Sequence, residues 1–147
     1  MNRSGCDLQR FHRAQGGDDR GVYAQALLEL RAGLKQSHWI WFVLPQLRGL
    51  GRSAMAERYG IADLAEVRAY LADPLLRRRL EEVIAVIAEQ LRSPEQSLPS
   101  LMGGELDAAK TISSLTLFEA AGLASAGQLL DQLGGRRCRQ TLRRLQG

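Results

Sequence analysis

Residues 73–92, DPLLRRRLEEVIAVIAEQLR, carry the clearest helical pattern in this chain. Asp73 followed by Pro74 is a strong helix start, because a carboxylate can accept hydrogen bonds from the free N–H groups of the first turn and proline fits the first helical position. The apolar residues recur at helical spacing and form one stripe: Leu76, Leu80, Val83, Ile84, Ile87 and Leu91. We therefore expect a long helix that is buried along this stripe and solvated on its charged side.

Shorter helical signals lie on both sides of this segment. Before it, they predict a helix over 7–15 capped by Asp7, a helix up to about Leu30 with Gly33 as terminator, a helix from Ser53 to Tyr59 capped by Ser53, and a helix over 63–71 with a capping box of Asp63 and Glu66. After it, they predict a helix over 105–121, a helix over 125–134 with a capping box of Ser125 and Gln128, and a last helix in the arginine-rich tail. The apolar run 39–44 is compatible with a strand or a helix, and we favour a helix capped by Ser37. Residues 93–104 predict a loop.

About eight helices and few β-patterned segments predict an all-α fold. We expect one compact domain over residues 7–147, which includes a basic C-terminal helix at 136–147, after a disordered segment at 1–6.

The composition, with 45% hydrophobic and 24% charged residues, is typical of a soluble globular protein. The apolar run 39–44 is far too short to span a membrane. The N-terminus is rich in arginine where an export signal would be apolar, so we expect a cytoplasmic protein. Cys6 and Cys138 lie near opposite ends, and together with the two histidines they match no zinc-ligand spacing. We expect neither a metal nor a cofactor.

The positive charge is concentrated at the end of the chain. Residues 136–147 contain five arginines and no acidic residue, whereas the whole chain has a net charge of +4, so the remainder is slightly acidic. Such a segment can bind nucleic acid or an acidic partner, but it is more commonly a solvated helix face. It holds no aromatic residue on which a base could stack.

Residues 35–53, KQSHWIWFVLPQLRGLGRS, hold both tryptophans of the chain between polar ends. His38 could act as a general base or bind an anion; the structural alternative is a histidine bonded to backbone at a helix start. Trp39 and Trp41 would point about 200° apart on a helix. One of them could therefore stack on a planar ligand, although core filling by both is the more common outcome.

The Gly49–Gly51 turn precedes an arginine, a serine and a predicted helix. Because a helix N-terminus offers free N–H groups, Arg52 and Ser53 could bind a phosphate or a carboxylate there. The alternative is a tight turn capped by Ser53.

The helix predicted at 105–121 carries a polar strip on an otherwise apolar surface. At 100° per residue, Asp107, Lys110 and Ser114 fall within an arc of about 60°. They could be a surface pair, Asp107 with Lys110, worth about half a kcal/mol or less. They could equally form a pocket wall, in which Lys110 binds an anionic group and Asp107 or Ser114 orients the ligand.

Five motifs together resemble a known family. They are Asp7-Leu-Gln-Arg-Phe11-x-x-Ala-Gln15, Lys35-x-Ser-His-Trp-x-Trp-Phe42, Pro45-Gln46, Gly49-Leu-Gly51-x-Ser53 and Lys110-x-x-Ser-Ser-x-Thr-Leu-Phe118. Over roughly residues 7–145 the chain resembles the bacterial domain-of-unknown-function family 1810, some members of which are labelled calpastatin. The resemblance implies a mainly helical single domain, and members of this family have no assigned activity. Ala72 stands where members often have a histidine, so a role for that histidine would not extend to this chain.

Two functions remain open. In the first, residues 37–53 meet residues 107–114 in a polar pocket that binds a small anionic ligand, such as a nucleotide, and could hydrolyse it. Its predicted catalytic residues are His38 and Asp107, and its predicted ligand-binding residues are Lys35, Ser37, Trp39, Trp41, Gln46, Arg52, Ser53, Lys110, Ser113 and Ser114. In the second, the protein is a non-enzymatic binding module that uses its arginine-rich C-terminus for nucleic acid or an acidic protein partner.

Overall fold

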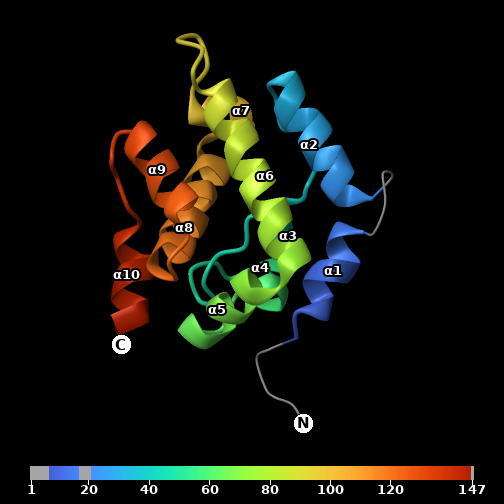
Figure 1. The fold of residues 1–147 in the computed structure, drawn as a ribbon, viewed down its shortest axis with the longest axis vertical. Helices are drawn as coiled ribbons and strands as arrows, with labels where there is room; N and C mark the ends of the chain where they lie inside the picture. The colour runs from blue at the N-terminus through green and yellow to red at the C-terminus, as the bar shows by residue number, and fades with distance from the viewer. Residues whose placement is uncertain (1–6, 17–20, 147) are drawn as a thin grey trace.

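The computed structural model describes residues 7–16 and 21–146, and within them the chain forms ten helices (Figure 1). Their bounds are α1 Gln9–Gln15, α2 Val22–Ala32, α3 Ile40–Val43, α4 Ala54–Tyr59, α5 Leu64–Ala72, α6 Pro74–Gln90, α7 Leu98–Met102, α8 Glu105–Ala120, α9 Ala124–Gln132 and α10 Arg139–Gln146. The predicted all-α fold is confirmed, with ten helices in these residues instead of about eight. None of these helices is both long and apolar enough to cross a membrane. The prediction of a disordered segment at 1–6 lies outside the described residues.

α6 is the long helix expected from its apolar stripe, and in Figure 1 it runs between α2 on one side and α8 and α9 on the other. Asp73 caps it as predicted, since its Oδ1 accepts hydrogen bonds of 3.1 Å from the N–H groups of Leu75 and Leu76. α2, α5 and α9 pack against it. The stripe is buried at Leu76, Leu80, Val83, Ile84 and Ile87, and Leu91 at its end is partly buried. The amphipathic pattern therefore predicted both the helix and its buried side.

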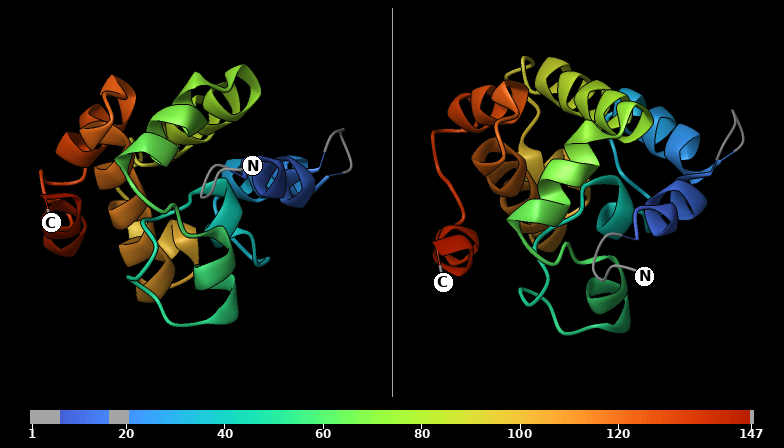
Figure 2. Two further views of the ribbon diagram at one scale, coloured as in Figure 1. Left: turned by 90° about the horizontal axis from the view of Figure 1, so that it is seen from below. Right: turned by 60° about the horizontal axis from the view of Figure 1, so that its bottom comes forward.

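α8 is the second central helix, and it is buried around its whole circumference over residues 111–118. α3, α7, α9 and α10 surround it, and Figure 2 shows α10 at the outer edge of the molecule. Two of its hydroxyl groups are satisfied within the helix: Thr111 donates to the carbonyl of Asp107 at 2.8 Å, and Thr116 donates to that of Ile112 at 2.7 Å. These bonds let polar residues occupy an enclosed helix.

The predicted helix ends were partly wrong. The caps at Ser53 and Asp63 are confirmed, because each side chain accepts a hydrogen bond from the N–H group three residues later. Asp7, Ser37 and Ser125 do not cap: α1, α3 and α9 begin without a side-chain cap bond. The Ser125 hydroxyl is instead buried with no hydrogen-bond partner among the described residues.

The predicted loop at 93–104 contains a helix, α7, which the sequence did not reveal. The Ser97 hydroxyl caps it by accepting a hydrogen bond of 3.2 Å from the N–H group of Ser100. α7 has only five residues and contains Pro99, so its periodic signal is too short to stand out from a serine- and proline-rich loop.

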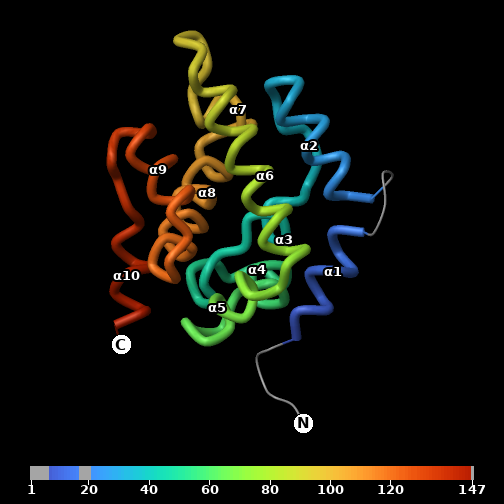
Figure 3. The backbone as a smooth tube through the Cα atoms, viewed as in Figure 1, coloured from blue at the N-terminus to red at the C-terminus, as the bar shows by residue number. Residues whose placement is uncertain are grey.

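Two links without helix position the polar residues of interest: 33–39 between α2 and α3, and 44–53 between α3 and α4 (Figure 3). The second link is tied to the segment between α4 and α5, because Leu47 and Ile61 form a short parallel bridge. The N–H group of Arg48 donates to the Ile61 carbonyl at 2.8 Å, and the Ile61 N–H group donates to the Gln46 carbonyl at 2.9 Å. There is no room for a side chain at Gly60 beside this bridge, since a Cβ there would lie 2.7 Å from the Arg48 Cα.

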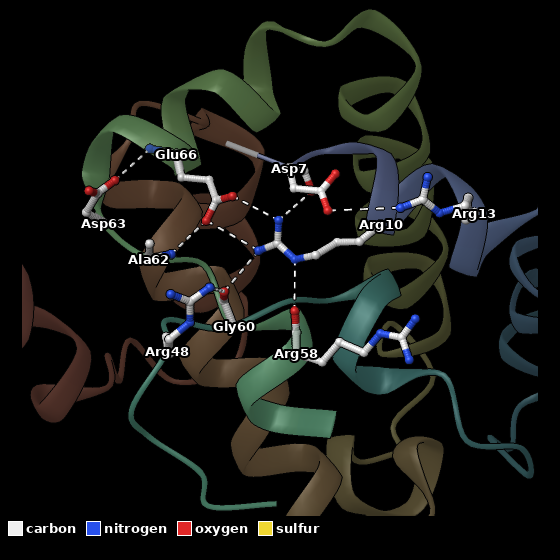
Figure 4. A network of polar contacts seen from close by, with 9 residues as sticks. All are labelled: Asp7, Arg10, Arg13, Arg48, Arg58, Gly60, Ala62, Asp63 and Glu66. Carbon is white, nitrogen blue, oxygen red and sulfur yellow. Dashed lines mark hydrogen bonds and ion pairs between the residues drawn. The ribbon is translucent and has the colours of Figure 1, made fainter. Parts of the chain in front are cut away.

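A buried ion pair between Arg10 and Glu66 joins α1 to α5 (Figure 4). The guanidinium lies 2.9 Å from the Glu66 carboxylate and also donates to the carbonyls of Arg58 at 2.9 Å and Gly60 at 3.0 Å. Glu66 accepts a further hydrogen bond of 2.8 Å from the N–H group of Ala62. Glu66 therefore reaches back past its helix start as a capping-box residue does, but its main partner is a distant arginine.

Candidate functional site

A hollow of about 450 Å³ lies where the link between α2 and α3 meets the start of α8. We call it the lysine hollow, and it is lined by Lys35, His38, Ile40, Trp41, Gly103, Gly104, Glu105, Leu106, Asp107 and Lys110. It combines two segments that lie far apart in the chain. Of the predicted site residues, the structure brings Lys35, His38, Trp41, Asp107 and Lys110 together here.

The chain has only two lysines, and both approach the carboxylate of Asp107. The Lys35 ammonium lies 2.7 Å from Oδ2 and donates to the Ser37 carbonyl at 2.6 Å. The Lys110 ammonium lies 3.7 Å from Oδ1. The Lys35 side chain is 5% exposed and that of Lys110 is 31% exposed. Lys110 is therefore the ammonium that a ligand can reach without breaking a buried ion pair.

Each ammonium also lies over the face of a tryptophan. Lys35 Nζ is 4.9 Å from the centroid of the Trp39 ring, and Lys110 Nζ is 5.2 Å from that of Trp41. Trp39 is fully buried, whereas Trp41 packs against the core and lines the hollow. Core filling is thus complete for Trp39 only, and Trp41 presents a planar surface beside a cation.

The exposed residues of the lining are both polar and apolar. His38 is exposed and lines the hollow. Leu106 is 79% exposed, the highest value among the exposed large hydrophobic residues described. α8 begins in the wall without a side-chain cap, so N–H groups of its first turn are available there.

Glu29 of α2 fixes the link that carries Lys35 and His38. Its carboxylate accepts hydrogen bonds from the N–H groups of Gln36 at 2.8 Å and Ser37 at 3.0 Å, from the Ser37 hydroxyl and from the Trp39 indole at 2.9 Å. Burial alone would raise the pKa of Glu29, but the bonds from Ser37, Gln36 and Trp39 outweigh it and lower the pKa to about 2. Sequence reasoning missed this residue, because a glutamate at the edge of an apolar helix stripe resembles an ordinary solvated position.

The sequence profile of the family described as "Protein of unknown function (DUF1810)" matches residues 5–145. The chain belongs to this family. A solved structure of a conserved hypothetical protein, Rv1873 from Mycobacterium tuberculosis, is 40% identical and superposes with a TM-score of 0.86, covering 98% of this chain and 99% of that one. No curated protein matches the chain. The resemblance seen in the sequence motifs is confirmed, as is the helical fold that it implied.

Three residues predicted from the central stretch of this DUF1810 chain serve the scaffold instead of lining the lysine hollow. The Ser37 hydroxyl donates to Glu29, and Trp39 fills the core. Gln46 lies at the short bridge to Ile61 and, beside Trp41, lines a cavity of only about 10 Å³. That volume holds no more than a water molecule.

Arg52 and Ser53 do not line the lysine hollow. Ser53 caps α4 by accepting a hydrogen bond of 3.1 Å from the N–H group of Ala56. Arg52 lines a different hollow, next to α10. The structure thus divides the single predicted pocket into two places.

The serines of α8 also lie away from the lysine hollow of this DUF1810 member. Ser113 donates to the sulfur of Cys138 at 3.3 Å, and the Ser114 hydroxyl is buried without a partner among the described residues. Burial would raise the pKa of Cys138, but hydrogen bonds from the Ser113 hydroxyl and from the backbone N–H groups of Gln140 and Thr141 lower it overall. In the described ranges, no three His, Cys, Asp or Glu side chains are grouped closely enough to hold a metal ion.

Proposed function

We propose that the lysine hollow binds a small ligand that joins an anionic group to a planar apolar part, as a nucleotide does. Lys110 is the observation that carries this proposal, because its partly exposed ammonium lies between the Asp107 carboxylate and the face of Trp41. A planar ring could stack on Trp41. The anionic group would then pair with Lys110, whose contact of 3.7 Å with Asp107 is too long to be a hydrogen bond.

The rest of the lining supports a ligand of mixed character. Leu106 offers exposed apolar surface, and His38 offers a ring nitrogen that can donate or accept a hydrogen bond. The uncapped start of α8 adds backbone N–H donors. A hollow with apolar walls and a few converging polar groups is the usual form of a small-molecule site.

The charge of the lining restricts the ligand class. Lys35 and Lys110 are offset by Glu105 and Asp107, so the lining has no net charge while His38 is neutral. We therefore expect a small anion held by directed contacts, and we expect polyanions to bind no better here than single phosphate esters.

Hydrolysis by His38 and Asp107 stays a prediction. Both residues line the hollow, but the Asp107 carboxylate already contacts two ammonium groups. His38 is then the residue that could take a proton from water. If the ligand is turned over, His38→Gln should abolish product formation, measured by mass spectrometry, while binding persists.

Binding can be tested by calorimetry and thermal unfolding with a panel of nucleotides, sugar phosphates and polyanions. At least one nucleotide should raise the Tm of the wild type, and Lys110→Ala should weaken its binding about tenfold or more. Arg78→Ala is the matched control, since Arg78 is an exposed cation on α6 outside the hollow, and it should leave binding unchanged. If no ligand stabilises the wild type, the proposal fails.

The presence of only two lysines permits a second, independent readout. An amine-acetylating reagent should modify Lys110 faster than the buried Lys35. A ligand in the hollow should slow the modification of Lys110, which peptide mass spectrometry can follow. Binding without protection of Lys110 would place the ligand elsewhere.

The alternative, in which the arginine-rich C-terminus binds nucleic acid or an acidic partner, also stays a prediction. One of its five arginines is already engaged: Arg137 lies 2.7 Å from Glu119 and 2.9 Å from Asp131. The charge available to a partner is therefore smaller than the sequence suggested.

A further inference from the structure

We propose that a second hollow, between the Gly49–Arg52 turn and α10, binds a small multivalent oxyanion such as pyrophosphate. This arginine hollow has a volume of about 300 Å³ and is lined by Gly49, Leu50, Arg52, Gln140, Arg143 and Arg144. Three arginines and one glutamine therefore line it, and none of the lining residues is acidic. The site is separate from the lysine hollow, with which it shares no lining residue.

The guanidinium groups of this hollow lack the carboxylate partners that some other arginines of the chain have. Arg10 and Arg137 each lie within 3 Å of a carboxylate. For Arg52, Arg143 and Arg144, in contrast, no carboxylate of the described residues lies within 4.0 Å. Like charges lining one hollow repel one another, and an anion bound among them would replace that repulsion with attraction.

The turn is shaped to receive one of these guanidinium groups. Gly49 has a φ of +99°, and a Cβ there would lie 2.8 Å from Cζ of Arg144. The Arg144 guanidinium therefore lies directly against the backbone of the turn, and the positive φ favours glycine at residue 49. The turn is itself held in place, because the N–H group of Arg48 donates to the Ile61 carbonyl at 2.8 Å.

α10, which supplies the other side of the hollow, is held against α8. The Cys138 N–H group donates to the Thr116 hydroxyl at 3.0 Å, and Thr141 is fully buried. Arg137 anchors the start of this segment through Glu119. Arg143 and Arg144 are thus carried by a fixed helix toward a fixed turn, which favours a preformed site over a mobile basic tail.

The chemistry of the lining selects the ligand class. Guanidinium groups bind phosphate oxygens in bidentate fashion, and several of them together match an anion that carries two or more charges. The lining contains no aromatic residue on which a base could stack. A compact oxyanion therefore fits better than a nucleic acid, which needs a longer track of phosphate contacts.

Calorimetry and thermal unfolding with inorganic pyrophosphate and phosphate test the proposal at fixed ionic strength. Pyrophosphate should bind the wild type and raise its Tm, and phosphate should bind more weakly. Arg52→Gln and Arg144→Gln should each weaken pyrophosphate binding about tenfold or more. Arg139→Gln removes the same charge from the same helix at an exposed position outside the hollow, and it should change affinity less than about threefold.

Three results would overturn the proposal. The first is no binding of pyrophosphate to the wild type, and the second is a loss of pyrophosphate affinity in Arg139→Gln equal to that in Arg144→Gln. The third is a single-stranded oligonucleotide that binds more tightly than pyrophosphate and depends on Arg139 as much as on Arg144. The last result would favour nucleic acid along the whole of α10. Lys110→Ala should retain pyrophosphate binding, so the outcome is independent of the function proposed for the lysine hollow. Circular dichroism of each variant checks that the helices are intact.

Discussion

Glu29 shows how one residue can fix the geometry of a site that it does not line. Its carboxylate holds Gln36, Ser37 and Trp39, and so sets the path of the link between Lys35 and α3. Without these bonds, four donors of the link would lose their acceptor: two backbone N–H groups, the Ser37 hydroxyl and the Trp39 indole. Positioning of the lysine hollow therefore begins on α2, outside the hollow itself.

Glu29→Gln tests this role through the dependence of stability on pH. Because the pKa of Glu29 is about 2 in the folded protein against 4.5 as its ordinary value, the ionised carboxylate contributes stability above pH 4.5, and that contribution is lost as the pH falls toward 2. Urea unfolding at pH 7 should find Glu29→Gln less stable than the wild type, and the difference should shrink at pH 3. A difference that stays constant from pH 7 to pH 3 would contradict this account.

At the scale of the helices, sequence reasoning succeeded where a local pattern decides the structure. The cap at Asp73 and the apolar stripe of α6 needed no tertiary information. It failed where tertiary contacts decide: Ser37 was free to cap by its sequence context but donates to Glu29 instead. Glu66 was correctly placed in the first turn of α5, but nothing local indicates that its partner is Arg10 on α1.

The Arg10–Glu66 pair should be among the most costly contacts to break, because the side chains are 9% and 1% exposed. Glu66→Gln should lower the free energy of unfolding by about 3–5 kcal/mol, since it leaves a buried guanidinium without its counter-charge. Urea unfolding measures the change. Arg13→Ala is the control, because the Arg13–Asp7 pair is exposed and 4.0 Å long, and it should change stability by less than about 0.5 kcal/mol. Equal changes in the free energy of unfolding for the two substitutions would show that the buried ion pair does not stabilise the packing of α1 against α5.

At the scale of the whole molecule, the predicted site was partly recoverable from sequence. Asp107 and Lys110 lie three residues apart on one helix, so helical geometry alone places them on a shared face. Their meeting with Lys35 and Trp41 depends on how α3 packs against α8. Arg52 comes only a few residues after α3 in the sequence, yet it lies next to α10 and not in the lysine hollow. Proximity in sequence thus predicted a single pocket where the fold makes two.

The C-terminal segment gives the last prediction, because its packing distinguishes an integral helix from a basic appendage. α10 covers α8, Thr141 is fully buried, and the hydrogen bonds from Arg137 lower the pKa of Glu119 even though burial opposes the shift. Deleting residues 136–147 should therefore lower the free energy of unfolding by more than about 2 kcal/mol, since it uncovers part of α8 and leaves Glu119 unpaired.

Urea unfolding of this deletion beside the full-length double variant Arg136→Gln/Arg139→Gln separates packing from charge. Both residues are exposed, so the double variant should keep the stability of the wild type although it loses two positive charges. A deletion as stable as the wild type would mean that α10 contributes nothing to the fold. The arginine hollow would then have no fixed wall, and a tail that binds nucleic acid would become the better account of this segment.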